Sequence, residues 1–171
     1  MPVRTVLQLG DPLLREVCTP VPDPTAPAVA VLVADLADTL AHWRRETGYG
    51  RGIAAPQLGV LSRVVFLHLP GREPWPLVNP EIVEQSGQQR GEEGCLSVPG
   101  IYDKVERAQR VVVRYLDLDG KEQTVVAEGI LSVCLQHEID HLQGRVFVEH
   151  LSQLKQQRIK SKLSKQARIT A

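Results

Sequence analysis

Residues 129–142 read GILSVCLQHEIDHL, and the apolar positions of this stretch recur with the period of a helix. His137 and His141 are four residues apart, so on a helix both imidazoles lie on one face and can bind one metal ion. Glu138 lies roughly 100° around the helix axis from His137, where its carboxylate can reach a water on that ion without being a ligand. The stretch therefore predicts a helix, at least half buried, that carries a metal site in the floor of a cleft.

A catalytic metal ion of this kind needs a third protein ligand. Cys95 is the favoured candidate, because glycines flank it in Gly91-Glu92-Glu93-Gly94-Cys95-Leu96-Ser97-Val98-Pro99-Gly100 and leave room for the backbone to approach an ion. Cys134 precedes the first histidine by three residues, but its apolar neighbours suit a buried structural thiol with a raised pKa. Glu149 and His150 are the downstream alternatives. The residues alone leave the third ligand open among these four.

Length and composition are those of an ordinary globular protein. The chain has 171 residues, 43% hydrophobic and 23% charged, and we expect residues 1–171 to form a single catalytic domain. The formal net charge of zero argues against a nucleic-acid binder that works through bulk charge. The three cysteines include no CxxC pair, which argues against a disulfide framework. The sequence shows neither a membrane-spanning run nor a signal peptide, so we expect a cytoplasmic protein.

Helix signals occur in three further places. Asp11-Pro12 combines an N-cap with proline at the first helical position and predicts a short helical turn. From about residue 28 to residue 47 the apolar residues recur at helical spacing, and Gly48 ends this helix. Ser152 can cap a C-terminal helix over about residues 152–169.

Strand signals lie between the two long helices. The expected strands cover residues 64–69, 77–85 with a break at Pro80, 111–118 and 123–127. Asp119-Gly120 predicts a hairpin between the last two, and the glycine-rich residues 48–57 predict a loop or an irregular strand. This order predicts an α+β fold, in which antiparallel or mixed sheets pack around the central helix, with a long N-terminal helix and a C-terminal helix.

Three segments together resemble the signature motifs of the peptide deformylases, in the order and at the spacing of that family. They are Gly50-Arg51-Gly52-Ile53-Ala54-Ala55-Pro56-Gln57, Glu93-Gly94-Cys95-Leu96-Ser97 and Gln136-His137-Glu138-Ile139-Asp140-His141. The resemblance covers nearly the whole chain. It implies a metal-dependent hydrolase that removes the formyl group from N-formyl-methionine at the start of newly made polypeptides and releases formate.

The resemblance also implies roles for the matching positions. Glu138 would move the proton of the attacking water, and the Gln57 amide and the backbone N–H of Leu96 would stabilise the oxyanion. The metal ligands would be Cys95, His137 and His141. The substrate would lie against Gly50, Arg51, Gly52, Ile130, Val133 and Cys134.

Arg51 departs from the family pattern, which usually has an aliphatic residue at this position near the pocket for the methionine side chain. In one interpretation its stem lies along the rim of the pocket and its charged head is in water. In the other, Arg51 changes the pocket entrance or contacts a carbonyl of the peptide. The sequence leaves open which substrate residues the enzyme prefers after the first methionine.

The ligand types by themselves suit zinc. The resemblance instead implies Fe(II) as the physiological ion, with Zn(II), Ni(II) or Co(II) able to occupy the same site. Next to the metal segment, Glu93 can pair with an arginine such as Arg107 and hold that segment in place.

The sequence after Glu149 contains no acidic residue and carries a series of cations on the expected C-terminal helix. These are Lys155, Arg158, Lys160, Lys162, Lys165 and Arg168. The helix is either a solvated amphipathic helix or a contact with ribosomal RNA, which would place the enzyme near the emerging chain. No membrane partner is expected.

Two other functions compete with the deformylase. A peptidase would use the same ion and Glu138 but would take a third His or Glu ligand. A protein with a structural metal would need four protein ligands, and Cys134 is the plausible fourth.

Overall fold

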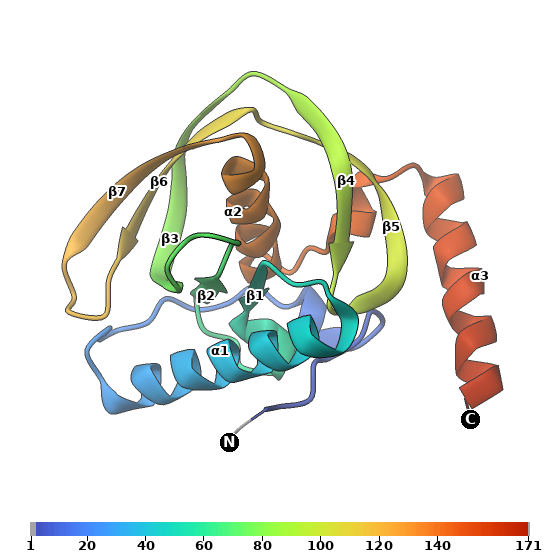
Figure 1. Ribbon diagram of the computed structural model, residues 1–171, viewed down its shortest axis with the longest axis horizontal. Coiled ribbons are helices and arrows are strands. Elements are labelled where there is room, and N and C mark those ends of the chain that lie inside the picture. The colour runs from blue at the N-terminus through green and yellow to red at the C-terminus, as the bar shows by residue number, and fades with distance from the viewer. Residues whose placement is uncertain (1–2, 171) are drawn as a thin grey trace.

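The computed structural model describes the backbone of residues 3–170 and the side chains of residues 3–165, so residues 1, 2 and 171 of the expected domain lie outside it. A central helix, α2 (Gly129–Leu142), runs through the middle of the molecule, and long strands arch over it (Figure 1). Leu135 and Leu142 are completely buried, and His141 is 1% exposed. The helix predicted for this stretch is confirmed, and it is enclosed on nearly all sides.

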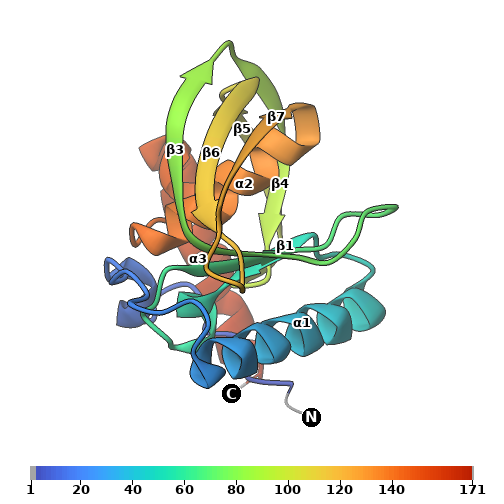
Figure 2. The same cartoon turned by 90° about the vertical axis from the view of Figure 1, so that its left-hand side faces the viewer.

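One antiparallel sheet has the strand order β1-β2-β3-β6-β7. Its strands are β1 (Gly52–Ala54), β2 (Val64–Leu67), β3 (Trp75–Ser86), β6 (Arg110–Leu116) and β7 (Glu122–Glu128). A second sheet pairs β4 (Gln89–Cys95) with β5 (Val98–Arg107), also antiparallel. The two sheets flank α2, with β3, β6 and β7 on one side and β4 and β5 on the other (Figures 1 and 2).

The remaining helices cover the outside. Helix α1 (Pro27–Thr47) ends at Gly48, which takes a positive φ of 73°, and α3 (Gln153–Thr170) stands at one side of the molecule (Figure 1). Single turns of 3-10 helix are η1 (Pro12–Arg15), η2 (Ala55–Leu58) and η3 (Phe147–His150). The α+β architecture with N-terminal and C-terminal helices is confirmed.

The local capping signals also hold. The Asp11 side chain accepts a hydrogen bond from the Leu13 N–H at 3.0 Å and starts η1. The Ser152 hydroxyl accepts one from the Lys155 N–H at 3.2 Å at the start of α3. No helix among the described residues is both long and apolar enough to cross a membrane.

Two features differ from the sequence prediction. Pro80 does not break β3, because Asn79 takes a positive φ of 50° and the pairing with β6 shifts register between Val78 and Glu81 while the strand continues. Strands β4 and β5 were not predicted. Their glycines and charges weaken the strand signal, and their ladder forms only because one face packs against η1, η3 and α3 in a common core cluster.

The core places the site between rigid layers. Leu77 and Val113 of the large sheet are completely buried in one cluster with α2. Helix α1 packs against the other side of β1 and β2 through a second cluster that includes Leu36 and Ile53. Each fully buried side chain of this kind contributes roughly 1.5–3 kcal/mol by leaving water. Helix α2 and strand β1 are therefore held at a fixed separation.

Candidate metal centre

Three side chains from two distant segments of the chain meet beside the second half of α2. One ligand atom each from Cys95, His137 and His141 lies within 4.8 Å of the others, and all three residues are buried. The Cys95 Sγ is 3.5 Å from the His141 Nε2, a separation close to that between two ligands on one tetrahedral ion. Among the described residues, no other group of His, Cys, Asp and Glu has this arrangement.

The alternatives to Cys95 lie elsewhere. Cys134 is buried on α2, and burial raises the pKa of its thiol to about 11. His150 binds Asp140 at 2.8 Å, and Glu149 faces Arg145 at the surface. No fourth protein ligand comes from the part of the chain that the structure describes, so the donor set is that of an open site and not of a closed structural one.

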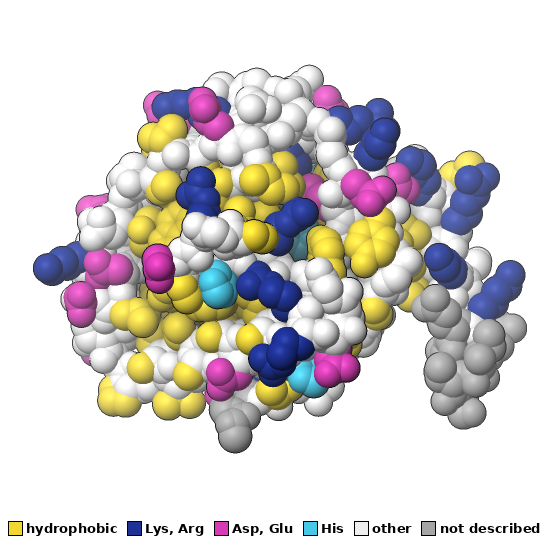
Figure 3. All heavy atoms as spheres, in the orientation of Figure 1, with side chains coloured by type: hydrophobic (Ala, Val, Ile, Leu, Met, Phe, Trp, Pro, Cys, Tyr) yellow, Lys and Arg dark blue, Asp and Glu magenta, His cyan; other side chains and the backbone are white. Residues whose placement is uncertain are grey.

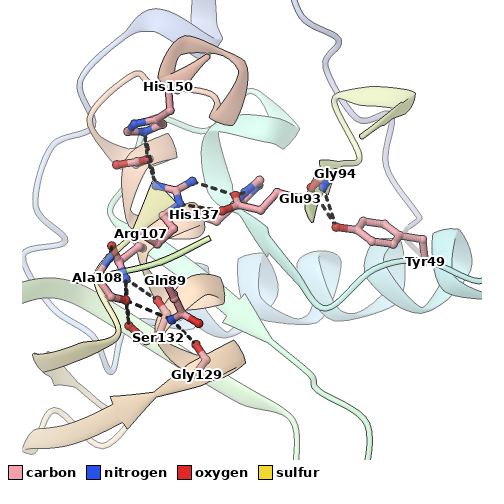
Figure 4. A network of polar contacts seen from close by, with 12 residues as sticks. Tyr49, Gln89, Glu93, Gly94, Arg107, Ala108, Gly129, Ser132, His137 and His150 are labelled. Atoms are coloured by element: carbon pink, nitrogen blue, oxygen red, sulfur yellow. Dashed lines mark hydrogen bonds and ion pairs between the residues drawn. The ribbon is translucent and has the colours of Figure 1, made fainter. Parts of the chain in front are cut away.

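The local structure explains why Cys95 points at the helix. Cys95 ends β4 at a tight turn in which it pairs with Val98 of β5. The Tyr49 hydroxyl donates to the Gly94 carbonyl at 3.0 Å and accepts from the Gly94 N–H at 3.1 Å (Figure 4). Gly94 itself has no room for a side chain, because a Cβ there would lie 2.5 Å from the Tyr102 ring. The backbone before Cys95 is therefore held from two sides.

A buried ion pair supports His137 from behind. Arg107 donates to Glu93 through two nitrogens at 2.8 and 2.9 Å, and Glu93 lies 2.8 Å from the His137 Nδ1 (Figure 4). Burial alone would raise the pKa of Glu93, but hydrogen bonds from Arg107 and His137 lower it to about 2. The ionised carboxylate requires the His137 Nδ1 to donate, which leaves Nε2 free for an ion. The predicted pairing of Glu93 with Arg107 is confirmed.

The network continues to the surface. Arg107 also donates to Asp140 at 2.7 Å, and Asp140 contacts the partly exposed His150 at 2.8 Å. Burial would raise the pKa of Asp140, whereas the His150 and Arg107 contacts lower it to about 2. Arg107 thus holds two carboxylates, and this continuation was missed in the sequence because its members are far apart along the chain.

The charges at the site fit a divalent cation. Burial lowers the pKa of His141 to about 3, so this ring is neutral and available as a ligand. Burial acts in the same direction on His137, but Glu138, Cys95 and Glu93 raise its pKa well above the usual value. The same negative surroundings that hold a proton on His137 would hold a cation in its place.

Glu138 lies next to the ligands and has an unusual environment. Its side chain is buried, and its Oε1 has no hydrogen-bond partner among the described atoms. Burial raises the pKa of this carboxyl to about 7. An unpartnered buried oxygen beside three side chains that can bind a metal ion is the arrangement expected of a group that handles the proton of a water.

Gln57 is oriented by the backbone around it. Its Oε1 accepts from the Ala54 N–H at 2.9 Å, so its Nε2 points toward the site, 3.0 Å from the Ser97 hydroxyl and 3.5 Å from the Cys95 Sγ. The amide is 1% exposed. Its donor is thus fixed before any substrate arrives.

A cleft opens over these groups. It is lined by Tyr49, Arg51, Gly52, Gln57, Glu93, Gly94, Cys95, Leu96, Val133, Cys134, His137 and Glu138. Of the residues predicted to contact substrate, Gly50 and Ile130 are not in this lining. Gly52 cannot carry a side chain, since a Cβ there would lie 2.8 Å from a Glu138 oxygen and 2.6 Å from Leu67.

The comparison with known proteins agrees with this site. The family model described as polypeptide deformylase matches residues 3–157. This chain belongs to the polypeptide deformylase family.

Its relatives match it over nearly their whole length. The peptide deformylase of Alkalilimnicola ehrlichii is 45% identical over 98% of this chain and 93% of the relative. That of Neisseria gonorrhoeae is 47% identical over 99% of each. A crystal structure of a peptide deformylase from Legionella pneumophila superposes with a TM-score of 0.89 at 42% identity, covering 98% of this chain and 97% of that one. The Ehrlichia chaffeensis enzyme in complex with actinonin gives 0.89 at 36% identity, covering 97% and 98%.

Tyr49 is a lining residue of this deformylase that sequence reasoning missed. It lies just before the Gly50 motif, and nothing in its own pattern separates it from a surface tyrosine. Its function depends on Gly94, which is distant in sequence and reaches it only through the second sheet.

The substitution Glu93→Gln should lower metal affinity by about 10- to 100-fold, because the amide holds His137 and Arg107 less strongly than the carboxylate does. Chelator competition on the reconstituted deformylase would measure this, with circular dichroism to verify the fold. The exposed neighbour Glu92 provides the matched control, Glu92→Gln, which should leave affinity unchanged. Equal affinity of the Glu93 variant and the native chain would contradict the assigned support.

Proposed function

We propose that this deformylase hydrolyses the formyl amide of newly made polypeptides that begin with N-formyl-methionine, with Glu138 as the general acid and base. The observation that carries the proposal is the buried, unpartnered Glu138 oxygen in the cleft, one residue from His137. The family to which the chain belongs consists of hydrolases for this formyl group, so the reaction class and the Cys/His/His site agree.

The proposed metal ligands are Cys95, His137 and His141, and a divalent ion held by them would make a bound water acidic near neutral pH. Glu138 takes the proton of the attacking water and passes it to the leaving nitrogen. A carboxyl whose pKa is about 7 can do both, because it gives up and accepts a proton with similar ease at neutral pH.

The developing negative charge on the formyl oxygen needs donors that are already in place. We assign these to the Gln57 Nε2 and the backbone N–H of Leu96, the residue after Cys95. The support is the orientation of Gln57, whose oxygen is held by the Ala54 N–H so that its nitrogen faces the site. Donors that need no rearrangement stabilise the transition state without a cost at the moment of reaction.

The peptide is proposed to lie along β1. This strand pairs with β2 on one side, and no described strand pairs with its other edge, which borders the cleft at Gly52. A peptide backbone can add to such an edge. Arg51, Val133 and Cys134 would then surround the first side chain, whereas Gly50 and Ile130 do not line the cleft.

The substitution Glu138→Gln should lower kcat for formate release from formyl-Met-Ala-Ser by about 10²- to 10⁴-fold, since the amide cannot transfer a proton. Formate would be measured anaerobically with a metal-loaded enzyme, and the metal content of the variant would be determined. Glu128, an exposed carboxylate before the same helix, provides the control variant Glu128→Gln. Full activity in a metal-loaded Glu138→Gln enzyme would contradict the proposed mechanism. A native chain that releases no formate would contradict the proposed function.

We propose Fe(II) as the physiological ion, with Zn(II), Ni(II) or Co(II) as ions that the same ligands accept. Two imidazoles and a thiolate bind all of these, so the donor set alone does not choose between them. The Fe(II) enzyme should lose its activity in air, because ferrous iron and the Cys95 thiolate both oxidise. Formate release after anaerobic loading with each ion, before and after exposure to air, would measure this. An Fe(II) enzyme as stable in air as the Zn(II) enzyme would contradict the assignment.

Helix α3 is proposed to contact ribosomal RNA, which would bring the cleft near the emerging chain. Ile159 and Leu163 pack against the core, which leaves Arg158, Lys160, Lys162 and Lys165 exposed. Their attraction to phosphate would release counterions and therefore depend on salt. This packing also supports a single catalytic domain that includes α3.

Removing two of these charges, with Arg158→Gln and Lys162→Gln together, should weaken co-sedimentation with ribosomes. The slope of the log binding constant against log salt concentration should become shallower by about one per charge removed. The control is Arg114→Gln, which removes an exposed cation from the large sheet. If the double variant sediments like the native chain at low salt, α3 is only a solvated helix.

A further inference from the structure

Arg51 is a cation in the wall of the cleft that pairs with no carboxylate among the described side chains. Two other arginines near the site already have hydrogen-bond or ion-pair partners. Arg44 donates to the Gly50 and His68 carbonyls, and Arg107 holds Glu93 and Asp140. Within the cleft, the charge of Arg51 is therefore available to a ligand.

The position of this charge is well defined. The guanidinium carbon lies 5.9 Å from the centre of the Tyr49 ring. The Cys134 thiol of α2 lines the same cleft, and the charge of Arg51 partly offsets the effect of burial on that thiol's pKa. The backbone beneath it is fixed, because the Arg51 carbonyl accepts from the His68 N–H at 2.8 Å. The cation thus lies in the wall of the cleft that the segment before β1 shares with α2.

The carboxylates that could neutralise Arg51 have other partners or functions. Glu93 is bound by Arg107 and His137, and Glu138 lies deeper in the cleft beside the metal ligands. On the face of the molecule seen in Figure 3, dark-blue cationic side chains stand among hydrophobic ones near the middle. A divalent ion in the site would add to the positive potential of the cleft.

We propose that Arg51 selects among formylated chains by the charge of the residue that follows formyl-methionine, and favours an acidic side chain there. This inference rests on the proposed function. The first residue is the same in every such chain, so a difference between substrates can come only from the residues after it. A long cation at the cleft entrance reaches past the first side chain and forms a charge-assisted hydrogen bond with a carboxylate.

The test compares peptides formyl-Met-X-Ala with X as Glu, Gln or Lys, all with a C-terminal amide. The amide removes the terminal carboxylate, which would otherwise offer Arg51 a second anion. Glu and Gln have the same shape and differ in charge. We expect kcat/KM at low ionic strength to be about three- to tenfold higher for Glu than for Gln, and lowest for Lys. The ratio of kcat/KM for the Glu peptide to kcat/KM for the Gln peptide should fall as salt is added.

Variants locate the effect at Arg51. In Arg51→Met, which keeps a long stem without the charge, the ratio of Glu to Gln should fall to about one. Arg51→Lys should retain part of the ratio, because a point charge remains without the planar donor pair. Arg15 is exposed and outside the cleft, so Arg15→Met removes the same charge elsewhere and should keep the native ratio.

Equal kcat/KM for the three peptides in the native enzyme would overturn the inference and leave the deformylase function intact. A native ratio that persists in Arg51→Met would also overturn it, since the preference would then come from another group. If no peptide released formate, the proposed function itself would be refuted, and the inference with it.

Discussion

The buried contact between Arg107, Glu93 and His137 is the interaction on which the site depends. Arg107 lies at the end of β5, Glu93 near the end of β4, and His137 in the middle of α2. Burying a guanidinium and a carboxylate costs several kcal/mol each, and the two hydrogen bonds from Arg107 to Glu93 offset that cost. The same carboxylate then orients the ligand His137. Loss of either partner would leave an uncompensated charge directly behind the metal centre.

Close packing also fixes the positions of the groups in the site. Gly52 and Gly94 stand where a Cβ would overlap Glu138 and Tyr102, so the backbone approaches the reacting groups as closely as it can. The Tyr49 hydroxyl holds Gly94 by two hydrogen bonds. The groups around the metal site come from a helix, two strands and a short 3-10 turn, which are more rigid than free loops. Positioning of this kind allows a small formyl group to be held with few contacts.

Much of the fold was accessible from local signals. The 129–142 helix follows from its apolar period, and the hairpin follows from Asp119-Gly120, where the Gly120 N–H donates to the Asp117 carbonyl. The pair β4 and β5 was not accessible. Its glycines argue against strands, and its stability comes from packing against η1, η3 and α3, which are distant in sequence. Likewise, Pro80 predicts a break in β3, but the strand continues because Asn79 takes a positive φ and the pairing with β6 shifts register.

For the site, the sequence by itself indicated two metal ligands and the proposed proton-transfer group, because the α-helix places His137, Glu138 and His141 by its own geometry. It favoured Cys95 as the third ligand, but Cys134, Glu149 and His150 stayed possible until the family resemblance was considered. Only the tertiary structure decided that Cys95, 46 positions from His141, meets the helix, and that Glu93, 44 positions from His137, supports it. Only the tertiary structure brought Arg51, Tyr49 and Cys134 into the wall of one cleft. Local periodicity fixes relations within one turn of helix, whereas contacts between distant segments depend on how the two sheets close around α2.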